Sequence, residues 1–218
     1  MKLFIDTANL DQINELVTYN IISGVTTNPS LMAKEGISGK QNCHKRYIDI
    51  CEVVDGPVSA EVISTDHKGM LDEAYELSAL HPNIVIKIPM IKEGVKAIYE
   101  LNKNGIKTNC TLVFSAAQAL LAAKAGATYV SPFIGRLDDV NEDGLELIKS
   151  IRMIYDNYNF ETNILAASIR SKAHINKCAE IGADFATIPY TLLNQLFDHP
   201  LTTKGLEIFL ADHAKLNP

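Results

Sequence analysis

The sequence contains no tryptophan and only four cysteines among its 218 residues. Cys43, Cys51, Cys110 and Cys178 are scattered, with no CxxC spacing and no neighbouring histidine pattern. This arrangement argues against the common zinc motifs and against a disulfide scaffold, and it favours free thiols in a reducing cytoplasm. The six histidines show no HxxH or HExxH spacing. We therefore expect a cytoplasmic protein without a metal site.

Long apolar runs and dense basic runs are also missing. The amino terminus reaches Asp6 after three apolar residues, which is too short for the apolar region of a signal peptide, and nowhere do 18 uncharged apolar residues follow one another. The formal net charge of −6 argues against nucleic acid or an anionic membrane as a partner. An anionic substrate would need a few cations placed locally.

Short β-type runs alternate with amphipathic helical stretches along the chain. Eight strand-helix units in little more than 200 residues predict a (β/α)8 barrel, because a doubly wound sheet usually has fewer strands and a glycine-rich phosphate turn. No GxGxxG or Walker motif occurs. The predicted strands are residues 3–6, 24–27, 58–63, 84–88, 107–112, 129–133, 164–168 and 185–188.

The predicted helices include residues 71–80, 95–102, 116–125, 145–155 and 173–181. Gly105, Gly126 and Gly182 stand where these stretches turn into the next strand. With 47% hydrophobic and 21% charged residues and no linker, the chain predicts one domain over residues 1–218. A last helix, at residues 202–215, lies beyond the eighth unit and is expected to pack on the barrel or, as favoured here, on a neighbouring subunit.

Lys87 is the most informative residue, because it places an amine inside the apolar run 84–89. Burial opposes the ammonium form and so favours the free amine that Schiff-base chemistry with a sugar ketone requires. The alternative is a lysine at a strand end whose head reaches water or a carboxylate.

Polar residues follow or end seven of the eight predicted strands. In such a barrel the carboxyl ends of the strands form the site, so these side chains are the candidates for chemistry. Two of the chain's four arginines are among them, and paired guanidinium groups suit a phosphate, although each could instead form a surface salt bridge. The candidates are Asp6, Thr26, Thr27, Asn28, Glu61, Lys87, Asn109, Thr111, Ser131, Arg136, Ser168 and Arg170.

Structural roles could explain several of these residues. Asp6 could cap the helix that begins near residue 10, although Asn9 is better placed to do so. Residues 26–28 precede Pro29 and could form a turn into a helix. Glu61 could be a surface residue of an edge strand, although a closed barrel has no edge. Polar fillers of the barrel core are the alternative for Asn109 and Thr111.

Three motifs carry a resemblance: GVTTNPS at 24–30, IKIP at 86–89 and SPFIGR at 131–136. Together they resemble the transaldolase family, and the similarity runs from residue 4 to residue 189. The compact length resembles the small microbial branch, which includes the fructose-6-phosphate aldolases. The resemblance implies a class I enzyme that acts on ketose and aldose phosphates, with no metal or organic cofactor. It also implies a homo-oligomer, a pentamer or decamer.

The resemblance and the residue chemistry agree on roles. Lys87 would form a Schiff base with the C2 ketone, and Asp6 would take the proton of the C4 hydroxyl. Glu61 and Thr111 would position a water for proton transfer. Asn28, Asn109 and Ser131 would contact the dihydroxyacetone unit, and Arg136, Ser168 and Arg170 would contact the phosphate. Thr26, Thr27 and Phe133 are also assigned to the substrate site. Thr26 would support Asp6 or the turn after the second strand.

Two positions bear on the reaction within the family. The fructose-6-phosphate aldolase branch typically has glutamine where this chain has Glu61 and tyrosine where it has Phe133. A tyrosine hydroxyl could protonate the enamine and release dihydroxyacetone, so this pair favours transfer. We therefore expect a transaldolase that converts sedoheptulose 7-phosphate and glyceraldehyde 3-phosphate to erythrose 4-phosphate and fructose 6-phosphate, in the pentose phosphate pathway. The alternatives are a fructose-6-phosphate aldolase and a non-catalytic phosphosugar-binding barrel.

Overall fold

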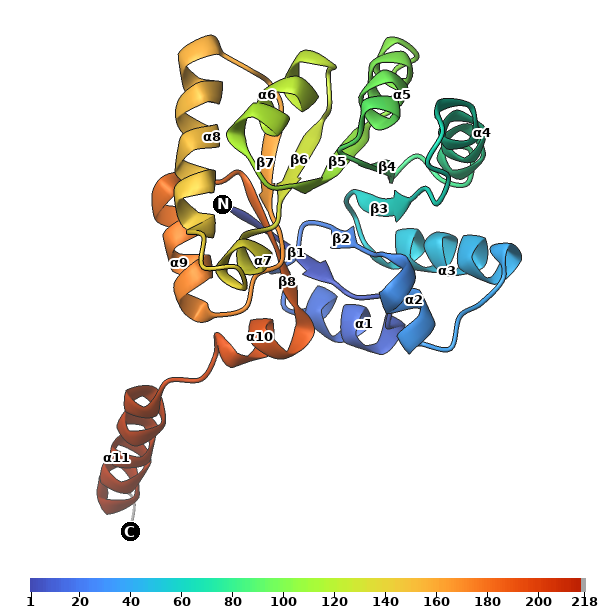
Figure 1. The fold of residues 1–218 in the computed structure, drawn as a ribbon. Helices are drawn as coiled ribbons and strands as arrows, with labels where there is room; N and C mark the ends of the chain where they lie inside the picture. The colour runs from blue at the N-terminus through green and yellow to red at the C-terminus, as the bar shows by residue number, and fades with distance from the viewer. Residues whose placement is uncertain (217–218) are drawn as a thin grey trace.

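The computed structural model describes residues 1–216, and within them eight parallel strands close into a barrel (Figure 1). Each strand pairs with the next, and β8 closes the ring by pairing with β1. The predicted (β/α)8 fold is confirmed. The strands are β1 (Lys2–Asp6), β2 (Val25–Thr26), β3 (Val58–Glu61), β4 (Ile84–Pro89), β5 (Thr108–Val113), β6 (Tyr129–Pro132), β7 (Asn163–Ala166) and β8 (Phe185–Pro189).

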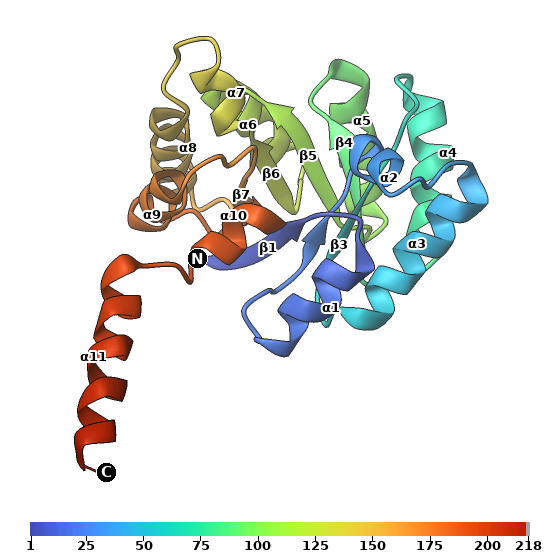
Figure 2. The ribbon, with the colours of Figure 1, turned by 90° about the horizontal axis from the view of Figure 1, so that it is seen from below.

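Helices surround the barrel and cover its outer face (Figure 2). Buried apolar side chains from strands and helices form one continuous core between the two layers, as expected for this architecture. The helices are α1 (Leu10–Thr18), α2 (Pro29–Lys34), α3 (Lys40–Val53), α4 (His67–Ser78), α5 (Lys92–Lys103), α6 (Ala116–Lys124), α7 (Ile134–Asp138), α8 (Gly144–Tyr158), α9 (Lys172–Ile181), α10 (Tyr190–Gln195) and α11 (Pro200–Leu216).

Local chemistry sets many of the boundaries. The Asn9 side chain accepts a hydrogen bond from the Gln12 amide and so caps α1, which leaves Asp6 free of that role. Ile91 precedes α5 and makes no side-chain cap bond. The predicted glycine turns are confirmed, since Gly105, Gly126 and Gly182 all have positive φ angles.

Four strands, β2, β3, β6 and β7, are shorter than predicted, and three of them end for a local reason. Beyond Glu61, the Val62 amide still donates to the Lys87 carbonyl oxygen, but the amides of Ile63 and Ser64 donate to the Glu73 carboxylate instead of to a strand, so β3 ends here. β2 ends at Thr26 because Asn28 already caps α2. β7 ends at Ala166, and Ser168 beyond it has a φ angle of 57°, in the left-handed region of the backbone.

The barrel interior has an apolar end and a polar end. Phe4, Val85, Tyr129 and Leu165 form a buried cluster with Phe185 packed against it. The Phe4 and Phe185 ring centroids are 5.0 Å apart. Because strand side chains alternate between faces, the residue two positions further along the same strand also points into the barrel. These five side chains, called the apolar plug below, therefore close the amino end of the barrel, and polar side chains line its carboxyl end.

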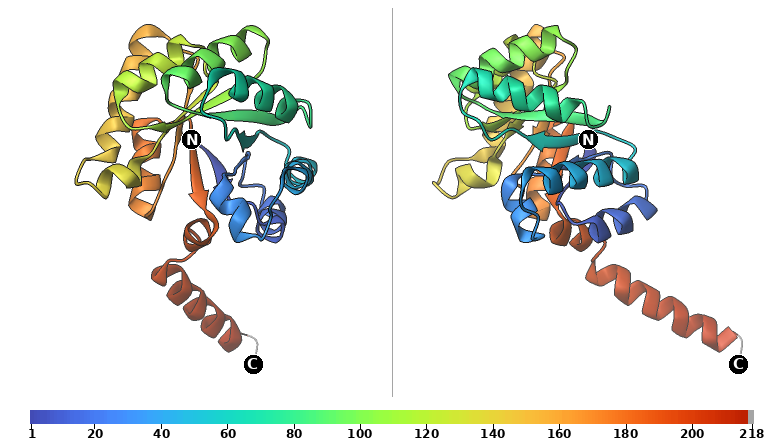
Figure 3. Two further views of the ribbon diagram at one scale, coloured as in Figure 1. Left: turned by 45° about the vertical axis from the view of Figure 1, so that its right-hand side comes forward. Right: turned by 90° about the vertical axis from the view of Figure 1, so that its right-hand side faces the viewer.

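The last helix, α11, leaves the barrel (Figure 3). It covers the predicted range 202–215, and none of its residues is buried. Large apolar side chains lie exposed along it, including Leu206, Phe209 and Leu210. Packing on the barrel is thus not its arrangement here. Within residues 1–216, no helix has both the length and the apolar character needed to cross a membrane.

Candidate active site

Lys87 lies inside the barrel on β4 and is buried, with a relative exposure of 6%. Its Nζ atom lies 3.0 Å from Glu61 Oε2 on the neighbouring strand β3 and donates to the Thr27 carbonyl oxygen at 3.1 Å. The pairing follows from register, because Glu61 and Lys87 are direct partners across the two strands. The lysine head does reach a carboxylate, as the structural alternative expected, but both charges lie inside the site.

A cavity of about 160 Å³ opens at the carboxyl end of the barrel, beside this pair. Eight predicted side chains line it, and they come from strands or turns that are far apart in the sequence. Two further residues, Ala167 and Thr187, were not predicted. The lining is Asp6, Thr26, Asn28, Lys87, Ser131, Phe133, Arg136, Ala167, Ser168 and Thr187.

Asp6 ends β1 and belongs to the cavity lining. The Thr26 hydroxyl donates to Asp6 Oδ1 at 2.7 Å, and the two Oγ1 atoms of Thr26 and Thr187 are 2.5 Å apart. Burial raises the pKa of Asp6, against the lowering effects of the Thr26 hydrogen bond and of the Lys87 and Lys34 charges. A carboxyl group whose pKa is raised by burial in a cavity suits proton transfer.

Below the cavity, amide and hydroxyl groups form a buried network. The Ser131 hydroxyl donates to Asn109 Oδ1 at 2.7 Å, and Asn109 Nδ2 donates to Ser59 Oγ at 3.3 Å. Asn109 is itself fully buried and supports the Ser131 side chain from below. Thr111 is also buried, and its Oγ1 atom has no hydrogen-bond partner among the described residues.

The two turn residues after Thr26 have structural contacts as well. The Thr27 hydroxyl donates to the Ser59 carbonyl oxygen at 2.9 Å, and the residue has no exposed surface. The Asn28 side chain accepts from the Leu31 amide at 2.9 Å and so caps α2, while it also lines the cavity. Residues 26–28 therefore do form a turn into a helix, as the structural alternative predicted. In addition, the Thr27 carbonyl oxygen accepts a hydrogen bond from Lys87.

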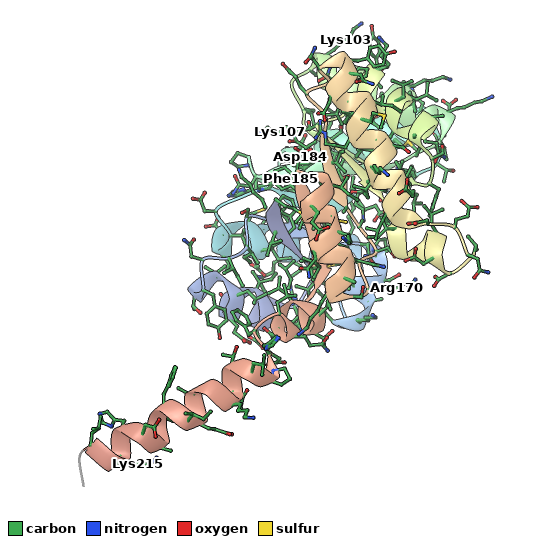
Figure 4. All side chains as sticks on the ribbon, turned by 90° about the vertical axis from the view of Figure 1, so that its left-hand side faces the viewer. Lys103, Lys107, Arg170, Asp184, Phe185 and Lys215 are labelled. Carbon is green, nitrogen blue, oxygen red and sulfur yellow. The ribbon has the colours of Figure 1, made fainter. Side chains whose placement is uncertain are left out.

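The two arginines differ in position. Arg136 lines the cavity, with its guanidinium carbon 5.1 Å from the centroid of the Phe133 ring. Arg170 does not line it, because its guanidinium forms a bidentate ion pair with Asp139, whose second contact is 2.7 Å. That ion pair holds the pKa of the Asp139 carboxyl below its usual range. Figure 4 shows Arg170 at the opposite end of the barrel from Asp184 and Phe185.

Gly135 makes the close approach of these loops possible. A Cβ atom there would come within 2.2 Å of the Ser168 carbonyl oxygen and 2.8 Å of Arg170 Nε. The glycine of the SPFIGR motif therefore lets the turn after β6 contact the turn after β7. This contact positions Arg136, Ser168 and Arg170 on one side of the cavity mouth.

A second cavity, of about 470 Å³, lies between α2, α3 and α4 on the other side of Glu61. Tyr47 on α3 lines it together with Glu61 and is itself buried. Burial raises the pKa of Tyr47, opposed by hydrogen bonds with the Thr27 side chain and the Glu61 backbone. Sequence reasoning missed Tyr47 because it lies within a helix and carries no strand-end signal.

Thr187 was missed although a signal for it exists. Phe185 belongs to the apolar plug, so the period-two rule places Thr187 in the polar layer above it. The same offset of two connects Phe4 to Asp6 and Val85 to Lys87. The eighth strand, for which no candidate was predicted, therefore also presents a polar group at this mouth.

The closed parallel barrel places a buried lysine, two carboxylates and an arginine at its carboxyl end, the end at which (β/α)8 enzymes carry their active sites. Within residues 1–216, no three His, Cys, Asp or Glu side chains gather so as to hold a metal ion. A family model described as transaldolase/fructose-6-phosphate aldolase matches residues 3–217. The chain belongs to this family.

Relatives of the same length support the assignment. The chain is 62% identical over 217 residues to a protein of Cytophaga hutchinsonii named "probable transaldolase", with 100% of both chains covered. It is 61% identical, at the same coverage, to a protein of the same name from Parabacteroides distasonis. The thiamine phosphate pyrophosphorylase of Pyrococcus furiosus shares the fold alone, with a TM-score of 0.61 and 14% identity over 86% of this chain and 85% of that one.

Proposed function

We propose that this protein is a transaldolase that transfers a dihydroxyacetone unit between sugar phosphates through a Schiff base on Lys87. The observation that carries the proposal is the buried Lys87 amine, which lines the cavity and lies 3.0 Å from a carboxylate. An ammonium group cannot attack a ketone, so the lysine must first lose a proton. Glu61 is within reach to accept that proton.

The first half of the reaction forms the imine. The neutral Lys87 amine attacks C2 of the ketose phosphate, and the resulting carbinolamine loses water to give the imine. Glu61 would supply and recover the protons, through a water also bound by the Thr111 hydroxyl. The buried and otherwise unpartnered Thr111 Oγ1 supports this role, since such an atom is costly without a partner.

The second half breaks the carbon chain. Asp6 takes the proton of the C4 hydroxyl, the C4 oxygen forms an aldehyde, and the C3–C4 bonding electrons move into the iminium system. The aldose phosphate leaves, and a three-carbon enamine stays on Lys87. A second aldose phosphate then accepts the unit by the reverse steps. The raised pKa of Asp6 supports its role as the group that takes and returns this proton.

The other lining residues would bind substrate. Asn28 and Ser131 would hold the dihydroxyacetone hydroxyls, with Asn109 fixing Ser131. Arg136 and Ser168 would bind the phosphate, and Arg170 would join them only after leaving Asp139. Thr26 would act through Asp6, and Thr27 through its carbonyl contact to Lys87.

Transfer is favoured over release because the cavity wall carries Phe133, which has no hydroxyl to protonate the enamine. The physiological reaction would convert sedoheptulose 7-phosphate and glyceraldehyde 3-phosphate to erythrose 4-phosphate and fructose 6-phosphate in the non-oxidative pentose phosphate pathway. The alternative is a fructose-6-phosphate aldolase, which the description of the family also includes.

Product analysis separates these reactions. Purified protein is given fructose 6-phosphate with and without erythrose 4-phosphate. A transaldolase makes sedoheptulose 7-phosphate and glyceraldehyde 3-phosphate only when the acceptor is present. Free dihydroxyacetone formed at a comparable rate without acceptor would make the enzyme an aldolase. Borohydride reduction should attach the substrate-derived carbons to the Lys87 peptide, and absence of this adduct would favour a non-catalytic binding protein.

The protein would work in the cytoplasm as a homo-oligomer, with ketose and aldose phosphates as its small-molecule partners. The exposed apolar side chains of α11 support packing of this helix on a second copy. Light scattering on the full chain tests this. The variant Phe209→Asp should lower the measured mass, whereas an unchanged mass would contradict a role of this face in assembly.

A further inference from the structure

Asp6 is supported by two hydroxyl groups in series. β1 lies between β2 and β8, and the Thr26 and Thr187 side chains from these flanking strands meet inside the barrel, with their Oγ1 atoms 2.5 Å apart. Thr26 then donates to Asp6 Oδ1 at 2.7 Å. Both threonines are at least 95% buried. This hydroxyl pair lines the cavity beside Asp6.

The number of protons fixes the direction of the bonds. A threonine hydroxyl has one proton, and Thr26 donates it to Asp6. The short contact between the two hydroxyls then requires Thr187 to be the donor and Thr26 the acceptor. Donation into Thr26 polarises its O–H group and strengthens the bond to the carboxylate. It also keeps the Thr26 proton directed at Asp6 rather than at Thr187.

We propose that Thr187 is a positioning residue that acts through Thr26 to hold the Asp6 carboxylate in place for proton transfer. The inference rests on the proposed role of Asp6. Only Oδ1 of Asp6 is engaged by this pair, which leaves the other carboxylate oxygen for the substrate hydroxyl. The remaining charged groups that face Asp6 are Lys87 from β4 and Lys34 from α2, with Arg136 across the cavity.

The test compares Thr187→Val with Thr187→Ser. Valine keeps the shape but removes the donor, and serine keeps the donor. We expect Thr187→Val to lower kcat about 5-fold at neutral pH, the effect of one neutral hydrogen bond. Because the Thr26 bond stabilises the ionised Asp6, the acid limb of the kcat/KM profile should also move to higher pH. Thr187→Ser should restore both the rate and the profile.

A purely structural role for Thr187 predicts a different result, namely an equal loss at every pH and no rescue by serine. That result would overturn the proposal. Thr187→Ala provides a second hydroxyl-free variant if valine prevents folding, and circular dichroism checks the fold. The double variant Thr26→Val/Thr187→Val should be no slower than Thr26→Val alone, since Thr187 acts through Thr26. If the rate loss of the double variant were instead the product of the two single losses, Thr187 would not act through Thr26.

Borohydride trapping on Lys87 separates this inference from the proposed function. If wild-type protein forms the adduct and Thr187→Val forms it at the same extent but turns over slowly, the defect lies in the step assigned to Asp6. If Thr187→Val shows wild-type rates and an unshifted profile while the adduct forms, the positioning role is wrong and the Schiff-base mechanism stands. If wild-type protein forms no adduct, the proposed function fails first.

Discussion

The Lys87 amine lies 3.0 Å from the Glu61 carboxylate, inside a barrel where only 7% and 17% of the two side chains are exposed. Two adjacent strands hold the pair in direct register. Removing one partner from a buried pair leaves an uncompensated charge, whereas replacing both with apolar groups restores balance. Stability and the proposed catalysis therefore depend on the same contact.

Lys87→Met should destabilise the fold by about 3 kcal/mol, because Glu61 is left without its partner. The double variant Lys87→Met/Glu61→Leu should recover most of this loss, although both variants are inactive. Urea unfolding measures the two free energies. Lys45→Met removes one partner of the exposed pair with Asp49 and should cost less than about 1 kcal/mol. Equal losses in the single and double variants would mean that the Glu61 charge left by Lys87→Met does not destabilise the fold, which would contradict the prediction.

Phe133→Tyr should shift the enzyme toward release of dihydroxyacetone. The Phe133 ring lines the cavity, so a phenol there could protonate the enamine on Lys87 before an acceptor arrives. We expect dihydroxyacetone formation from fructose 6-phosphate alone to rise about 10-fold or more, within the usual range for one added acid-base group. An enzymatic assay for dihydroxyacetone measures it.

Phe114→Tyr is the matched control for this change. The Phe114 ring packs against Phe133 at a centroid distance of 5.9 Å, but it does not line the cavity. The Phe114→Tyr variant should leave the ratio of dihydroxyacetone release to transfer unchanged. A similar rise in both variants would assign the effect to looser packing rather than to the new hydroxyl group.

Arg136→Ala and Arg170→Ala should affect phosphate binding unequally. Arg136 already lines the cavity, whereas Arg170 is held by Asp139 at the surface. Loss of a charge-assisted hydrogen bond costs about 1.5–3 kcal/mol, so Arg136→Ala should raise KM for glyceraldehyde 3-phosphate roughly 10- to 100-fold. The same substitution at Arg170 should raise it less than about 5-fold.

Steady-state kinetics with phosphorylated and unphosphorylated acceptors provides the control. D-Glyceraldehyde lacks the phosphate, so its KM should be nearly insensitive to Arg136→Ala. If Arg170→Ala matches Arg136→Ala with the phosphorylated acceptor, Arg170 must leave Asp139 when substrate binds. The equal assignment of the two arginines that the sequence suggested would then be correct.

The fold and most of the cavity lining follow from sequence because both depend on local patterns. Strand-end polar residues such as Asp6 and Lys87 are predictable, since parallel barrels place the carboxyl ends of all strands at one mouth. The hydrogen-bond partners of a side chain, by contrast, are not determined by the nearby sequence. The Thr27 hydroxyl turns to the Ser59 carbonyl, and Arg170 turns to Asp139, because partners from other strands and loops are closer than the cavity.

Thr187 and Tyr47 show two further reasons for misses. Thr187 could have been found from its spacing to Phe185, but only after Phe185 was known to point inward. Tyr47 lies on a helix outside the barrel, and its contact to the Glu61 backbone depends on how α3 packs on β3. Tertiary packing of this kind leaves no periodic signal in the sequence.

Asp6→Asn should make the protein more stable at neutral pH while abolishing turnover. Burial raises the pKa of Asp6 in the folded state, so the folded protein binds this proton more strongly than the unfolded chain does. Stability from this group is therefore complete below the unfolded pKa of about 3.9 and decreases as pH rises through the higher folded value. Asparagine removes that loss and can still accept from Thr26.

Thermal unfolding of Asp6→Asn and wild-type protein at pH 4 and pH 7 measures the effect. The midpoint of the variant should exceed that of the wild type at pH 7 by a few degrees, and the two should converge toward pH 4. Asp55→Asn changes an exposed carboxylate and should show no such pH-dependent difference. A variant less stable than wild type at pH 7 would mean that Lys87 and Lys34 stabilise the charged Asp6 more than burial opposes it. The charged Asp6 carboxylate would then not lower the stability of the fold, and its proposed role in proton transfer would not require a loss of stability.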